Sequence, residues 1–172
     1  DTSRFKYFLS QELNIPVRKI ESLVLGGHGD TMVSMLNHTT VDGKLVLDLV
    51  KEGKLKKESL NKIVQRTKTG GAEIVKLLEK GSAFYAPAAS GVEMAESYLN
   101  DLKKQLPCAA YLKGEYGVND LYVGVPVIIG KKGIEKIVII DLDNEEKKNF
   151  EHSISAVKEL FEAAKKIDTF LG

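Results

Sequence analysis

Apolar residues recur every three or four positions in four segments of the chain, which is the period of a helix with one buried face. This pattern predicts helices over residues 1–13, about 56–80, 92–106 and about 145–167. The positions on these faces are Phe5, Phe8, Leu9 and Leu13; Leu60, Ile63, Val64, Thr67, Ile74, Val75 and Leu78; Val92, Ala95, Leu99, Leu102 and Leu106; and Phe150, Ile154, Val157, Phe161 and Ala164. A short helix or a turn is expected over residues 44–53, KLVLDLVKEG.

Capping and breaking residues indicate where these helices begin, bend and end. Asp143 followed by Glu146 resembles a capping box at the start of the last helix, and Pro107 ends the third. Gly70 and Gly71 interrupt the second helix, where each glycine costs about 1 kcal/mol relative to alanine. We therefore expect a kink at this point, or two abutting helices.

Segments rich in β-branched and other apolar residues predict strands between these helices. They are residues 20–25, 31–41, 108–112, 121–130 and 136–142. The last two are separated by GKKG, which is typical of a tight hairpin. Because the chain has no repeats and no linker, we expect one domain over residues 1–172. Its class is expected to be α+β, a mixed and largely antiparallel sheet packed with long amphipathic helices.

Composition narrows the class of protein without identifying it. Apolar residues make up 43% and charged residues 28% of the chain, and the net charge of +1 gives no reason to expect a nucleic-acid partner or a membrane surface. No apolar run reaches the roughly 18 residues of a spanning helix, and the first residues lack the pattern of a secretory signal. The single cysteine, Cys108, fits a reducing compartment such as the cytoplasm, and its apolar neighbours favour a buried, unreactive thiol.

One histidine, His28, lies in a setting that favours chemistry. It follows an apolar strand and is flanked by glycines in LVLGGHGDTMV, residues 23–33. Histidine exchanges a proton near neutral pH, and glycines leave room for a ligand to approach the backbone. The alternative is a turn histidine followed by Asp30 as a capping residue. His38 and His152 lack such a setting, and we expect the first to be half-exposed on a strand and the second to be solvated on the last helix.

The residues that could act with this histidine are Asp1 and Arg4, which share the first turn of a helix and can face one side of it. A carboxylate beside an imidazole fixes its tautomer and favours the imidazolium, and an arginine grips a carboxylate with two hydrogen bonds. Such a trio suits proton transfer on a small carboxylic acid. The alternative is that Asp1 only caps the helix and Arg4 only lies on the surface.

Other familiar sites have weak support in the sequence. There are no paired cysteines, no His-x-x-x-His and no dense carboxylate loop for a metal ion. No glycine-rich phosphate loop joins a strand to a helix, and no G-x-S-x-G motif carries a nucleophilic serine. A metal-dependent hydrolase using His28 and Asp30 would need a bound metal, and we rank this alternative last.

Four segments together carry a family resemblance. They are DTSRFKYFLSQ, GGHGDTMV, GGAEIVKLLEKGSAFYAPAASGVEMAESYL and PCAAYLKGEYGVNDLYVGVPVIIG. They resemble the C-terminal half of the lactate/malate dehydrogenases, and most closely the lactate-dehydrogenase-like malate dehydrogenases of bacteria. By this resemblance His28 would accept the proton when a 2-hydroxy acid is oxidised, Asp1 would orient it, and Arg4 would hold the substrate carboxylate. Ser90 and the alanines beside it would form a wall of the pocket.

The resemblance also implies partners and a missing part. It implies NAD as cofactor, reversible oxidation of (S)-malate to oxaloacetate, and a dimer or tetramer of identical chains. The N-terminal dinucleotide-binding half, with the residues that select the substrate, is expected to be absent from this chain, which alone is expected to be inactive. Lactate or another 2-hydroxy acid is the alternative substrate, and a non-catalytic oligomerisation or ligand-binding module is the alternative class.

Overall fold

A computed structural model describes residues 1–168 of the chain, which form both helices and strands. The last four residues of the predicted domain lie outside the described part. The helices are α1 (Thr2–Leu13), α2 (Val46–Lys51), α3 (Lys57–Leu78), α4 (Tyr85–Leu99) and α5 (Asn144–Ile167), with 3-10 turns η1 (Val17–Lys19), η2 (Leu36–His38) and η3 (Glu115–Gly117). The strands are β1 (Ile20–Glu21), β2 (Val24–Leu25), β3 (Val33–Ser34), β4 (Thr40–Val41), β5 (Lys44–Leu45), β6 (Lys104–Lys113), β7 (Asn119–Gly130) and β8 (Gly133–Ile137).

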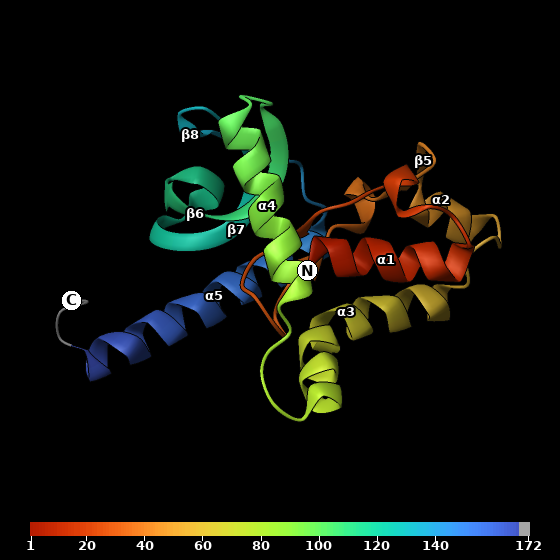
Figure 1. The fold of residues 1–172 in the computed structure, drawn as a ribbon, viewed down its shortest axis with the longest axis horizontal. Helices are drawn as coiled ribbons and strands as arrows, with labels where there is room; N and C mark the ends of the chain where they lie inside the picture. The colour runs from red at the N-terminus through yellow and green to blue at the C-terminus, as the bar shows by residue number, and fades with distance from the viewer. Residues whose placement is uncertain (169–172) are drawn as a thin grey trace.

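Within residues 1–168, three small sheets replace the single sheet expected from the sequence. Their strand orders are β1-β4-β5, β2-β3 and β6-β7-β8, and every pair is antiparallel. The fold is therefore α+β, as predicted; the described strand pairs are all antiparallel, where a mixed, largely antiparallel sheet was expected. Figure 1 shows α1 lying beside α3 on one side of the molecule, with β6–β8 on the other and α5 extending away from both.

In the described part of the chain, the buried apolar side chains form two cores. The first, here the sheet core, packs β6–β8 and β2–β3 against α5 and includes Leu25, Leu112, Val123, Val125, Phe150 and Ile154. The second, the helical core, joins α1, α2 and α3 and includes Phe5, Leu9, Val24, Val46, Leu60 and Ile63. Successive strand residues point to opposite faces. Val24 therefore faces the helical core and Leu25 the sheet core, so β2 links the two.

Two predicted strands are broken into shorter pieces. Residues 20–25 form β1 and β2, which belong to different sheets, and residues 31–41 are interrupted by η2 between β3 and β4. Thr39 accounts for the second break, because its hydroxyl donates to Met35 O and its amide to Leu36 O. These local hydrogen bonds compete with a continuous ladder.

The third predicted helix was wrong in its boundaries. α4 starts at Tyr85 and ends at Leu99, and Lys104 already belongs to β6, so residues 100–106 are not helical. The residue that anchors α4 is Ser97, whose buried hydroxyl donates to Ile129 O at 2.7 Å. Three residues of the predicted stripe face solvent instead, with Val92 58%, Leu99 76% and Leu102 48% exposed, whereas Leu106 packs against the sheet core. An apolar stripe therefore marked an exposed face.

The last predicted strand, 136–142, is also shorter than expected. β8 ends at Ile137, and the Tyr116 hydroxyl holds the following residues by donating to Val138 O and accepting from Ile140 N–H. The hairpin across Gly130 and Gly133 is present as predicted.

Two helix predictions are confirmed in detail. Asp143 accepts from Glu146 N–H and Asp143 N–H donates back to the Glu146 carboxylate, which is the predicted capping box. α3 continues through Gly70 and Gly71 as one helix, and Figure 1 shows its axis changing direction along its length.

Candidate active site

The loop that carries His28 is clamped at its start. Gly26 and Gly124 exchange two backbone hydrogen bonds, of 2.8 and 2.9 Å, which join the loop to β7. Gly26 has φ +90, and a Cβ on Gly124 would lie 2.5 Å from Gly26 O. Only glycine fits this close approach of two backbones. The loop therefore leaves the sheet core from a fixed point.

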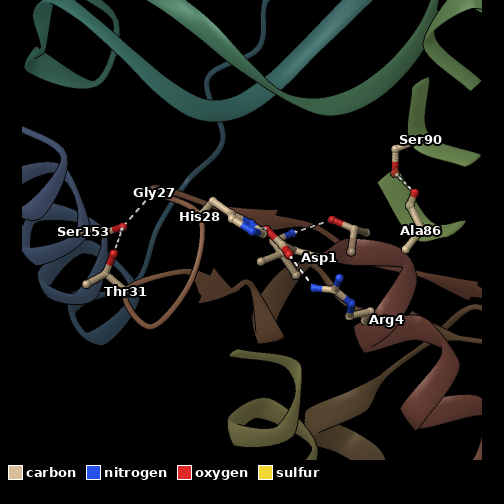
Figure 2. A network of polar contacts seen from close by, with 10 residues as sticks. Asp1, Arg4, Gly27, His28, Thr31, Ala86, Ser90 and Ser153 are labelled. Atoms are coloured by element: carbon tan, nitrogen blue, oxygen red, sulfur yellow. Dashed lines mark hydrogen bonds and ion pairs between the residues drawn. The ribbon is translucent and has the colours of Figure 1, made fainter. Parts of the chain in front are cut away.

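The second anchor of the loop is a helix more than a hundred residues further along the chain. Gly27 N–H donates to Ser153 Oγ of α5 at 2.8 Å, and the Ser153 hydroxyl donates to Thr31 Oγ1 at 3.3 Å (Figure 2). Both ends of the turn that contains His28 are thus tied to one buried side chain.

Asp1 and His28 meet directly. His28 Nδ1 lies 2.8 Å from Asp1 Oδ2, and Figure 2 shows the imidazole pointing at the carboxylate at the start of α1. The Asp1 side chain is 21% exposed and the His28 side chain 79% exposed. Because Nδ1 is held by the carboxylate, Nε2 is the nitrogen left to exchange a proton with a ligand.

Asp1 stands at the N-cap position of α1, yet its side chain makes no capping hydrogen bond. Its second oxygen, Oδ1, faces Arg4 Nη1 at 3.4 Å instead. Thr2, the next residue, accepts from Val24 N–H at 3.1 Å and so ties α1 to β2. The alternative that Asp1 serves only as a cap is therefore wrong, because one carboxylate oxygen contacts His28 and the other contacts Arg4.

Arg4 packs under α3, with its side chain only 12% exposed. Its Cδ would lie 3.1 Å from a Cβ on Gly70, and its Nη1 3.6 Å from one on Gly71. Among the described side chains, Arg4 Nε is buried without a hydrogen-bond partner. Such a donor is costly unless something binds to the group, and this arginine is not a surface residue.

An open cavity of about 1040 Å³ lies beside this trio. Asp1, His28 and Ser90 line it, together with apolar residues of which Leu23 and Met94 are examples. Ser90 is a wall residue whose hydroxyl is already used, since it donates to Ala86 O at 2.9 Å (Figure 2). Arg4 does not line this cavity. The structure therefore brings the three predicted residues together, but only two of them face the same hollow.

The other histidines and the single cysteine lie outside the Asp1–Arg4–His28 trio. His38 lies on η2 rather than on a strand, and its Nε2 is 2.6 Å from Asp141 O. His152 is exposed on α5 as predicted. Cys108 is only partly buried and lines the cavity; burial, and to a lesser extent the charge of Glu93, raises the pKa of its thiol, which favours the protonated form. Over residues 1–168 there is no group of three side chains that could hold a metal ion, and no helix that could span a membrane.

Sequence reasoning missed the residues that support the trio from a distance. Ser153 lies in unremarkable sequence, and only the fold brings it to the loop; Thr31 lies in the segment GGHGDTMV but was assigned no role there. Gly124 carried a usable signal, because a glycine inside a strand indicates a close backbone approach. Gly70 and Gly71 were interpreted only as helix breakers, although they also make room for an arginine.

Known proteins resemble this chain closely. The sequence model described as lactate/malate dehydrogenase, alpha/beta C-terminal domain, matches residues 1–168. A malate dehydrogenase of Pelagibacter ubique (strain HTCC1062) is 69% identical over 168 residues, which cover 98% of this chain and 52% of that protein. The chain thus spans about half the length of this curated relative.

Solved structures agree with the sequence match. The malate dehydrogenase of Cryptosporidium parvum has a TM-score of 0.93 and 45% identity, covering 96% of this chain and 52% of its own. The lactate dehydrogenase of Eimeria maxima, solved with NADH and oxamate, has a TM-score of 0.93 and 40% identity, covering 98% and 52%. By sequence and by fold, this chain belongs to the lactate/malate dehydrogenase family and corresponds to its C-terminal domain.

Proposed function

We propose that this chain is the catalytic and substrate-binding part of an NAD-dependent malate dehydrogenase, which oxidises (S)-malate to oxaloacetate reversibly. The observation that carries the proposal is the 2.8 Å contact between His28 Nδ1 and Asp1 Oδ2 at the edge of an open cavity. The 69% identity to a malate dehydrogenase supports the choice of substrate.

In this proposal His28 is the proton acceptor. Its Nε2 takes the proton of the substrate hydroxyl as the carbinol carbon gives up a hydride, so a positive charge develops on the imidazole. Asp1 holds the ring in one tautomer through Nδ1–H and stabilises that charge from 2.8 Å away. The exposure of the ring suits this role, because the substrate must reach Nε2.

Arg4 is the proposed partner of the substrate carboxylate. A guanidinium binds a carboxylate in a planar, two-bonded geometry that lysine cannot provide. Its nearly buried position and its unpartnered Nε support a role in which a ligand completes its hydrogen bonds. Because Arg4 lies outside the cavity lining, the proposal requires the carboxylate to enter between Asp1 and α3, or the arginine to extend toward the cavity on binding.

NAD would accept the hydride. The residues of this chain suit the ring of the cofactor that takes the hydride, but not its phosphates. The glycines of the His28 loop and the apolar cavity wall suit a flat ring brought against the imidazole. Within residues 1–168 no glycine-rich loop leads from a strand into a helix to bind phosphates. We propose that an N-terminal half, corresponding to the part of the relatives that this chain does not cover, holds the rest of the cofactor.

Oligomerisation and location in the cytoplasm belong to the same proposal. Large apolar side chains on α3 and α4 are exposed, with Leu77 at 77% and Tyr85 at 83%, and such side chains favour contacts with another chain. The single cysteine fits a reducing compartment.

The test uses the native protein that carries this chain. Replacement His28→Asn should lower kcat for malate by roughly 10²–10⁴-fold while the circular dichroism spectrum is retained, because proton transfer is lost without loss of volume. His152→Asn, an exposed histidine on α5, is the matched control and should leave kcat unchanged. Equal activity of His28→Asn and wild type would favour the non-catalytic module.

Substrate choice is tested on the same preparation. The proposal expects a higher kcat/KM for oxaloacetate than for pyruvate. The reverse order would identify the lactate alternative, which the likeness to a lactate dehydrogenase solved with NADH and oxamate keeps in view.

A further inference from the structure

Ser153 is a completely buried polar residue on α5, whose other buried side chains include Phe150 and Ile154 of the sheet core. Its hydroxyl accepts from Gly27 N–H at 2.8 Å and donates to Thr31 Oγ1 at 3.3 Å. A hydroxyl has one proton to donate, so these two bonds use its donor and one acceptor site. The serine is thus bound to the His28 loop and not to its own helix.

A second serine on the same helix, Ser155, shows the usual hydrogen bond of a helical serine that does not contact another segment. Ser155 is exposed and donates to Glu151 O, one turn back, at 3.0 Å. This return to the preceding turn is the usual local partner of a helical serine. Ser153 makes no bond of this kind among those observed, and its hydroxyl points across to the loop instead (Figure 2).

The packing leaves the loop little freedom at this point. A Cβ on Gly26 would overlap Ser153 Oγ and lie 2.9 Å from Ser153 Cβ. On its other side Gly26 is bonded to Gly124 of β7. The backbone that leads into His28 is therefore held between a strand and a helix.

We infer that Ser153 is a positioning residue for His28: it fixes the backbone of Gly27 so that the imidazole meets the Asp1 carboxylate. His28 follows Gly27 directly, and its own side chain is 79% exposed, so few side-chain contacts other than that with Asp1 hold the ring. The position of Nδ1 thus depends on the backbone, and the backbone depends on Ser153. This inference rests on the proposed function, because it assigns Ser153 to the proton-transfer step.

The decisive variant is Ser153→Ala in the native protein, with Ser155→Ala as a matched control on the same helix. Misplacing a reacting group by about 1 Å costs roughly 10²-fold in rate, so a loosened loop should lower kcat by roughly ten- to a hundredfold. KM for malate should change by less than about twofold, because Arg4 and its surroundings are untouched and uniform binding is preserved. Ser155→Ala should match wild type in both constants.

A second readout does not depend on turnover. Hydrogen exchange at the Gly27 amide, followed by NMR, should become faster in Ser153→Ala, while exchange in the buried strand β7 should stay as in wild type. Faster exchange throughout β7 would mean that the substitution only destabilises the sheet core, and would overturn the inference. Unchanged kcat with faster Gly27 exchange would overturn it as well.

Thr31→Val covers the case in which Ser153→Ala does not fold. This change keeps the volume of the threonine, removes the acceptor of the Ser153 hydroxyl and leaves the bond from Gly27 in place. It should lower kcat less than Ser153→Ala, with KM again unchanged, and an effect on KM alone would contradict the inference. Failure of the proposed function is recognised separately, because His28→Asn would then have no effect in the same assay.

Discussion

Gly70 lies against Arg4 so closely that a Cβ on the glycine would stand 3.1 Å from Cδ of the arginine. The absence of a side chain at Gly70 therefore makes room for Arg4, besides weakening the helix. Arg4, on α1, is held in a notch of α3, and the same helix changes direction along its length (Figure 1).

Replacement Gly70→Ala should raise KM for malate and oxaloacetate by roughly tenfold with a smaller effect on kcat, because it would displace Arg4, the proposed partner of the substrate carboxylate. Steady-state kinetics of the native protein would measure this. Asn61→Ala, at an exposed position of the same helix, raises helix propensity in the same direction and is the control. An unchanged KM in Gly70→Ala would contradict the proposal that Arg4 binds the substrate carboxylate.

The chain by itself should be nearly inactive. Purified residues 1–172, assayed with NADH and oxaloacetate, should turn over roughly 10³-fold or more slowly than the native protein, because a bound and oriented cofactor supplies much of the rate. Fluorescence titration should show weak binding of NADH to the isolated chain. Activity near that of a full-length relative would mean that these residues hold the whole cofactor, contrary to the proposal.

Cys108 should resist alkylation in the folded protein. Burial raises the pKa of its thiol above the ordinary 9.0, and the thiolate is the species that reacts. At pH 7.5 we expect iodoacetamide to modify it about tenfold more slowly than in the chain unfolded in urea. Mass spectrometry of the modified peptide measures both rates, and equal rates would mean that the thiol is accessible and normally acidic.

Asp143 should make the stability of the domain depend on acid. The pKa of this carboxyl lies below its ordinary 3.8. The largest cause is the hydrogen bond from Glu146 N–H, and a hydrogen bond from the Asn37 side chain lowers the pKa further. A group whose folded pKa is lowered contributes stability above its unfolded pKa, and this contribution is lost as the pH falls through the folded value.

Asp143→Ala should therefore lower the free energy of unfolding by about 1 kcal/mol at pH 7, the usual effect of removing an N-cap. The difference from wild type should shrink as the pH falls below about 4. Urea unfolding at several pH values tests this, with the exposed Asp141→Ala as control. A difference that persists undiminished at pH 2 would assign the effect to packing and not to the charged cap.

Much of the fold followed from local patterns. α1, α3 and α5 each have a periodic apolar stripe, and the capping box and GKKG mark their elements within a few residues. The errors share one physical cause, which is that a stripe or an apolar run does not reveal what it faces. Leu99 belongs to a regular stripe and yet is exposed. After Ile137 one backbone hydrogen bond to β7 remains, from Val138 N–H to Pro126 O, and the Tyr116 hydroxyl holds Val138 O and Ile140 N–H.

The site was predictable only as far as its residues are neighbours in the chain. Asp1 and Arg4 share a helical turn, so their spacing already suggested a common face. His28 comes from 27 residues away, so spacing could not show that it meets Asp1; the chemistry of the side chains suggested the pair and the family resemblance supported it. Ser153 is 126 residues from Gly27, and no local pattern could join them.

The contact of Asp1 with His28 also joins two separately packed regions. The α1 helix that begins at Asp1 is anchored by Phe5 and Leu9 in the helical core, whereas the His28 loop is fastened to β7 and α5 of the sheet core. If either core is not yet packed, Asp1 and His28 are both present in the chain but do not contact each other. The pair therefore forms only when both cores are packed, so folding of the whole domain is a precondition for the proposed proton transfer.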